Sequence, residues 1–149
     1  MRTAENLYLG GYTTYPRTES TDFSPNFDFK EILREFSGHP EWGDFATNLL
    51  TNGHNRPRKG LDAGDHPPIT PIRSATRSSF HGDREWKLYQ FIALSFLGCI
   101  SSDATYDSCA IMLEAGGEQF KASGKVLIKP GFLEIMHWHL GEDTAIPDM

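Results

Sequence analysis

The spacing of hydrophobic and polar positions changes about two thirds of the way along the chain. Up to Cys99, apolar residues recur every three or four positions, which is the spacing of amphipathic helices. From Tyr106 onward the spacing falls towards two, and Gly116-Gly117 and Pro130-Gly131 separate short apolar runs as turns would. The pattern therefore predicts an α+β chain, in which a helical segment precedes an antiparallel β segment.

Three helices are predicted in the first part. Asp28, with Glu31 three residues later, resembles a capping box that starts the first helix, and Gly38 stops it. Pro40 can open the second helix, whose apolar face ends at Asn52-Gly53. The predicted helices cover about 29–37, 40–52 and 85–99.

The remaining elements are predicted to be short or irregular. Residues 4–9 have the pattern of a helix ended by glycine, but too little chain precedes them for a proper helix. Tyr12–Tyr15 has the composition of a short strand, and 54–71 is too rich in Pro and Gly to be regular. Strands are expected at 109–113, around Phe120, and at 126–128 and 132–135, with Gly124 as a further turn.

Composition bounds the class of protein. The 149 residues, 38% of them hydrophobic and 12% aromatic, suffice for one globular domain or parts of two and are too apolar for a disordered chain. No apolar run reaches the ~18 residues of a membrane helix, and the N-terminus lacks a signal-peptide layout, so an intracellular protein is expected. The two cysteines, Cys99 and Cys109, are too few for a disulfide framework, and the residues around them lack the spacing of a zinc site.

Charge is distributed unevenly around a formal total of -6, which argues against indiscriminate nucleic-acid binding. Between His54 and Arg77, five basic residues face two aspartates, a balance of +3, within a stretch that also holds four prolines. From Cys99 to the end, three lysines face eight acids, a balance of -5. A basic loop whose backbone is restrained by prolines indicates a surface that faces phosphate groups. The alternative is that these basic residues only keep the protein soluble.

Two strings are more specific than composition. The first is GYTTYPRTES at 11–20, and the second is DAGDHPPITP at 62–71. In this order and at this distance, they resemble the catalytic-tyrosine region of type IA DNA topoisomerases, of the topoisomerase III class and its beta type. The similarity runs over nearly the whole chain, with supporting strings at 26–28, 55–60, 123–125 and 130–132.

The resemblance implies that Tyr15 is a nucleophile, which attacks a backbone phosphate and leaves a 5′-phosphotyrosyl link with a free 3′-hydroxyl. A phenol is a better leaving group than a sugar alcohol, so resealing needs no ATP. Arg17 would hold oxygens of the scissile phosphate, because residues two apart share a face in an extended chain. The alternatives are a tyrosine packed in a core and a surface arginine paired with Glu19.

The resemblance also makes His66 a phosphate-contacting and proton-handling residue, whereas a turn histidine fixed by prolines is the alternative. The His137-Trp138-His139 run lacks the further ligands of a metal site, so no metal is expected there. Nucleic-acid contacts are expected from Thr18, Glu19, Ser20, Arg56, Arg58, Lys59 and Asp65.

Parts of the family pattern are missing. Type IA enzymes need an N-terminal metal-binding domain with an Asp-x-Asp set and a general-acid glutamate, and these 149 residues contain no Asp-x-Asp. The chain is thus expected to be an internal piece: a CAP or winged-helix-like tyrosine domain at 1–100, an antiparallel part of the arch domain at 101–140, and a flexible tail at 141–149. Magnesium is expected in the parent enzyme alone.

Three functions remain in competition. The first is a topoisomerase that acts on single-stranded DNA, with RNA as a further substrate. It would work in the nucleus and also in the cytoplasm. An accessory protein is expected as a partner, and no membrane is. The second is a non-catalytic module that binds single-stranded nucleic acid. The third is an interaction module whose open strand edges pair with another chain.

Overall fold

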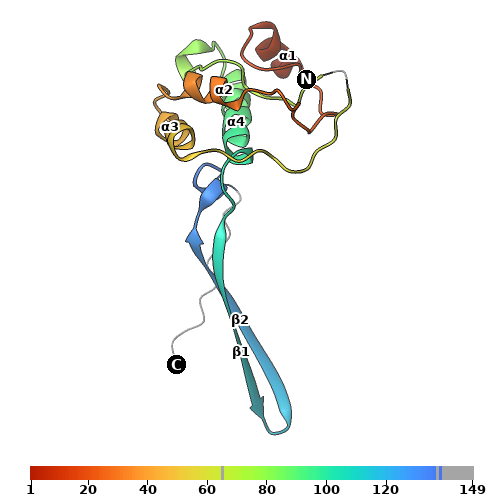
Figure 1. Ribbon diagram of the computed structural model, residues 1–149, viewed down its shortest axis with the longest axis vertical. Helices are drawn as coiled ribbons and strands as arrows, with labels where there is room; N and C mark the ends of the chain where they lie inside the picture. The colour runs from red at the N-terminus through yellow and green to blue at the C-terminus, as the bar shows by residue number, and fades with distance from the viewer. Residues whose placement is uncertain (65, 137, 139–149) are drawn as a thin grey trace. The chain divides into compact units, whose positions relative to one another are not determined.

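The computed structural model describes residues 1–64, 66–136 and 138, and the chain divides into two compact units (Figure 1). The first unit is Met1–Ser101 and holds the helices. The second begins at Ser102 and holds a two-stranded antiparallel sheet. The α+β class predicted from the sequence is therefore confirmed at this coarse level. No described helix is long and apolar enough to cross a membrane.

Local sequence signals explain where the helices of the first unit start. The Asp28 carboxylate accepts hydrogen bonds from the backbone N–H groups of Lys30 (3.0 Å) and Glu31 (3.2 Å), so the predicted cap is present. α4 begins after Gly82 with two acidic residues in its first turn. Their negative charges stabilise the helix because they lie near the positive end of its dipole. The helices are α1 (Arg2–Leu9), α2 (Phe29–Phe36), α3 (Gly43–Asn52), the 3₁₀ turn η1 (Arg77–Ser79) and α4 (Asp83–Cys99).

Two predictions about these helices are wrong in detail. α1 does form, because Leu7 is buried and α1 packs against α4, which supplies stability that so short a helix lacks by itself. α3 starts at Gly43 and not at Pro40, since Trp42 is a buried N-cap residue. At Gly43 a Cβ atom would lie 2.7 Å from the Ser37 carbonyl oxygen, so only glycine fits this close approach.

The core of the first unit is aromatic around His39. The His39 ring stacks on Trp42, with centroids 3.6 Å apart and planes within 5°. Its Nε2 lies 2.7 Å from the Ala75 carbonyl oxygen, and its Nδ1 accepts a hydrogen bond of 3.1 Å from the Glu41 N–H. These partners define the neutral tautomer with the proton on Nε2, and burial lowers the pKa of His39.

We expect the first unit to lose stability in mild acid because of His39. The unfolded chain takes up a proton near the ordinary pKa of 6.5, whereas the folded chain takes it up only at lower pH. The free energy of unfolding should therefore fall as pH drops from about 7 to about 5, by at most ~1.4 kcal/mol per pH unit for this one proton. His39→Gln should flatten this dependence in denaturation followed by tryptophan fluorescence. The exposed-histidine variant His81→Gln serves as the control, and equal profiles for both variants would contradict the assignment.

The second unit is a hairpin of β1 (Thr105–Ala115) and β2 (Glu118–Lys129), followed by the 3₁₀ helix η2 (Gly131–Glu134). Gly116 and Gly117 form the two-residue loop, and their φ values of 61° and 81° are open mainly to glycine. Cross-strand pairs such as Leu113 with Phe120 hold the register.

Three predictions for this region are corrected. The short strands around 109–113 and at 120 and 126–128 belong to two longer strands. Gly124 lies inside β2 opposite Cys109 and makes no turn. Residues 132–135 form no strand, because Leu133 is buried and its N–H closes a 3₁₀ turn onto the Pro130 carbonyl oxygen (2.9 Å).

Candidate active site around Tyr15

The two sequence motifs lie antiparallel, and backbone hydrogen bonds join them at one end beside Tyr15. Thr14 donates its backbone N–H to the Thr70 carbonyl oxygen (2.9 Å), and Ile72 donates its own to the Tyr12 carbonyl oxygen (2.8 Å). Thr13 forms an isolated bridge with Pro71. The predicted strand at 12–15 is thus reduced to one bridge, because the second motif offers a single short partner segment.

A second set of hydrogen bonds joins the far ends of the motifs. Thr21 donates its backbone N–H to the Leu61 carbonyl oxygen (2.7 Å), and the Leu61 N–H donates to Thr21 Oγ1 (2.8 Å). Ser20 Oγ accepts from the Ala63 N–H (3.0 Å). Residues 15–19 therefore lie between two ends that hydrogen bonds anchor, one at Thr14 and the other at Ser20 and Thr21.

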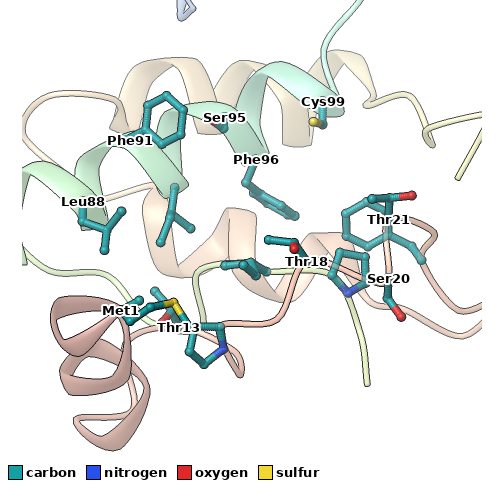
Figure 2. A pocket seen from close by; sticks show the side chains of 16 residues that line it. Met1, Thr13, Thr18, Ser20, Thr21, Leu88, Phe91, Ser95, Phe96 and Cys99 are labelled. Carbon is teal, nitrogen blue, oxygen red and sulfur yellow. The ribbon is translucent and has the colours of Figure 1, made fainter. Parts of the chain in front are cut away.

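Alternate residues of the first motif point in different directions. Pro16, Thr18 and Ser20 line a cavity of about 500 Å³, whose other wall is the face of α4 that carries Leu88, Phe91 and Phe96 (Figure 2). Tyr15, Arg17 and Glu19 do not line it. The Arg17 guanidinium lies over the Tyr15 ring, with Cζ 5.4 Å from its centroid, and a turn at Pro16, in place of the predicted extended chain, closes the Arg17 N–H onto the Tyr15 carbonyl oxygen (2.9 Å).

Three side chains surround the Tyr15 ring, which is 40% exposed. The Tyr8 ring of α1 meets it edge-on, with centroids 5.2 Å apart. The His66 ring lies at 6.4 Å with planes at 80°, and the Arg17 Cζ lies 5.4 Å from the Tyr15 centroid. This exposure excludes the alternative of a tyrosine packed in the core.

His66 is held beside Tyr15 by oxygen atoms. Its Nε2 lies 3.3 Å from Glu19 Oε2, and its Nδ1 lies 3.1 Å from the Pro67 carbonyl oxygen. Its side chain is only 9% exposed. Both ring nitrogens therefore face oxygen atoms, which orient the imidazole ring beside Tyr15. Glu19, which the sequence assigned to nucleic acid, contacts the histidine, and its contact with nucleic acid stays a prediction.

Two other residues predicted to contact nucleic acid have structural partners. Ser20 is 2% exposed and its hydroxyl accepts the Ala63 N–H, so it offers no surface to a phosphate. The Arg56 guanidinium donates from Nη2 to the carbonyl oxygens of Phe23 and of Ser24 (2.8 Å). The prediction for Ser20 is therefore corrected to a residue that holds two loops together, whereas Arg56 is exposed and its contact with nucleic acid stays a prediction.

The remaining candidates divide by exposure. Arg58 and Lys59 are exposed, as a phosphate contact requires, and Thr18 faces the cavity. Asp65 lies outside the described residues, as do His137 and His139. Within the described ranges, no group of three His, Cys, Asp or Glu side chains could hold a metal ion.

Sequence reasoning missed Tyr8 and the role of Thr14. The Thr14 hydroxyl donates to the Pro68 carbonyl oxygen (2.9 Å) and accepts the Thr70 N–H (2.8 Å). These partners lie more than fifty positions away, so no local spacing could have indicated them. Tyr8 lies in α1, where too little chain precedes residues 4–9 for the sequence to predict a proper helix.

Comparison with known proteins agrees with this geometry. A family model described as DNA topoisomerase matches residues 1–149. The chain belongs to the DNA topoisomerase family. DNA topoisomerase 3-beta-1 of Homo sapiens is 50% identical over 138 residues, which is 93% of this chain and 16% of that protein. DNA topoisomerase 3-beta of Arabidopsis thaliana is 42% identical over 147 residues, which is 99% of this chain and 17% of that protein.

These topoisomerase relatives confirm the resemblance to type IA enzymes of the topoisomerase III beta type that the two motifs indicated. A relative whose name does not specify the beta type, DNA topoisomerase 3 of Caenorhabditis elegans, is 36% identical over 148 residues, which is 99% of this chain and 19% of that protein. The chain spans less than one fifth of the length of these curated relatives.

Proposed function

We propose that the first unit carries the strand-cleaving tyrosine of a type IA topoisomerase. The Tyr15 oxygen attacks the phosphorus of a single-stranded DNA backbone, the bond from phosphorus to the 3′-oxygen breaks, and a 5′-phosphotyrosyl link remains. Attack by the freed 3′-hydroxyl reverses the step after strand passage and releases Tyr15. The observation that carries this proposal is the gathering of Arg17 and His66 around the half-exposed Tyr15 ring.

The neighbours of Tyr15 have separate tasks in this chemistry. Arg17 presents a planar fork of N–H donors that can hold two phosphate oxygens and offset the charge that grows in the transition state. His66 contacts the same phosphate by exchanging its Glu19 contact for a phosphate oxygen. Glu19 fixes the His66 ring through the 3.3 Å contact.

Cleavage also needs a proton for the departing 3′-oxygen. We propose that an acid from an N-terminal metal-binding domain, which these 149 residues do not contain, supplies it in the parent enzyme. That domain would also hold magnesium, because no Asp-x-Asp stands in this sequence and no described carboxylate cluster suits a metal. RNA as a second substrate, an accessory protein and a nuclear and cytoplasmic location belong to the same proposal.

A test follows from the leaving group. An oligonucleotide with sulfur in place of the bridging 3′-oxygen releases a thiolate, which needs no acid because a thiol ionises near pKa ~8.5. The chain alone should form a covalent adduct with this oligonucleotide, visible as a mass increase in denaturing mass spectrometry. The ordinary oligonucleotide should give little adduct, with or without magnesium.

The second candidate function, a binding module without turnover, predicts a different result. It is favoured by the absence of the acidic metal set from the sequence. Binding of the sulfur oligonucleotide without any adduct would overturn the catalytic proposal and favour this module. Strong cleavage of the ordinary oligonucleotide would overturn the external acid and make His66 the first residue to test in its place.

A further inference from the structure

The Thr14 hydroxyl joins the two halves of the site through the backbone. It donates to the Pro68 carbonyl oxygen (2.9 Å) and accepts the Thr70 N–H (2.8 Å). Thr14 directly precedes Tyr15, and Pro68 stands two residues after His66. This one side chain therefore links the residue before Tyr15 to the segment that carries His66.

The Thr14 hydroxyl and the Glu19 carboxylate are among the contacts that bear on the distance between these rings. Tyr15 is 40% exposed, and the two rings touch only edge-on at 6.4 Å. His66 lies in a turn that its prolines shape, while Glu19 fixes the ring from one side. A shift of the 66–68 segment relative to Thr14 would move the imidazole away from the phosphate that Tyr15 attacks.

We propose that Thr14 is a positioning residue, whose hydroxyl sets the separation of Tyr15 and His66. The inference rests on the proposed function for its catalytic consequence, since it assigns Thr14 to the transfer that Tyr15 performs. Thr14 itself touches no reacting atom. A misplacement of about 1 Å in such a site can cost on the order of 10²-fold in rate.

The chain offers a matched control at the opposite end of the motifs. Thr21 Oγ1 also accepts a backbone N–H, from Leu61 at 2.8 Å, and Thr21 lies six residues from Tyr15. Thr14→Val and Thr21→Val therefore make the same chemical change on the same kind of loop. If Thr14 serves stability alone, both variants should behave alike.

The experiment measures adduct formation by the full chain with the 3′-sulfur oligonucleotide. Thr14→Val should slow the adduct roughly tenfold or more, Thr14→Ser should restore it to within about twofold, and Thr21→Val should leave it within about twofold of the parent. Equal losses in Thr14→Val and Thr21→Val, or no rescue by serine, would overturn the proposal.

A second measurement does not depend on chemistry. The nuclear Overhauser contact between the Tyr15 and His66 ring protons should weaken in Thr14→Val, return in Thr14→Ser and persist in Thr21→Val. An unchanged contact in Thr14→Val overturns the role of Thr14. Absence of an adduct with the parent chain instead overturns the proposed function, and the ring contact then decides the position of Thr14 alone.

Discussion

A Tyr15→Phe variant is expected to form no detectable covalent adduct with the 3′-sulfur oligonucleotide. The substitution removes one oxygen atom, the proposed nucleophile, and keeps the ring that contacts Tyr8 and His66. Binding of the same oligonucleotide should change little, because phosphate contacts come from cations and backbone groups. Denaturing mass spectrometry measures the adduct, and fluorescence anisotropy of a labelled oligonucleotide measures binding.

Tyr8→Phe is the matched control for this experiment. Tyr8 is exposed to a similar degree, 43% against 40%, and lies edge-on to Tyr15 with centroids 5.2 Å apart. This variant should form adduct at the parent rate. If the adduct survives in Tyr15→Phe and disappears in Tyr8→Phe, Tyr8 is the nucleophile and the assignment of Tyr15 is refuted.

Arg17→Ala is expected to slow adduct formation by about 10²-fold or more, the scale for loss of one donor that acts in the transition state. The Arg17 Cζ lies 5.4 Å from the Tyr15 ring centroid, so the guanidinium stands beside the side chain of the proposed nucleophile. Arg17→Lys keeps the charge but loses the planar fork, and its rate should fall between those of the parent and the alanine variant. Rates come from single-turnover time courses at saturating oligonucleotide.

Arg34→Ala provides the control for charge, because Arg34 is an exposed residue of α2 outside the site. It should leave the rate constant at saturation unchanged. If Arg17→Ala and Arg34→Ala both weaken binding while neither alters the rate constant at saturation, Arg17 would be a general phosphate contact and its role in the transition state would be refuted.

Helix positions were predictable wherever a local signal was sufficient. The Asp28 cap and the apolar spacing after it located α2 to within a residue, because capping and amphipathic burial act over one or two turns. The start of α3 was not predictable from Pro40. Burial of Trp42 and the close approach of Gly43 to Ser37 depend on neighbours that sequence spacing does not reveal.

The site was predictable in its chemistry and less so in its arrangement. The motif strings selected Tyr15, Arg17 and His66, and the structure places Arg17 and His66 beside the Tyr15 ring, while their catalytic roles stay predictions. The same strings assigned Ser20 and Arg56 to nucleic acid, and folding gives each a backbone partner and buries Ser20. A polar residue in a motif can serve phosphate or the loop itself, and residue type does not distinguish the two.

By itself, the sequence determined the family, the α+β order of elements and the residue types that suit phosphate chemistry, since these depend on local patterns and specific strings. Only the tertiary structure decided which side chains lie around Tyr15. Thr14, Glu19 and Ser20 are similar small or polar residues of one motif, yet Thr14 contacts Pro68, Glu19 contacts His66 and Ser20 is buried against Ala63. Their partners lie more than forty positions away in the sequence, and only the folded backbone brings them within hydrogen-bond distance.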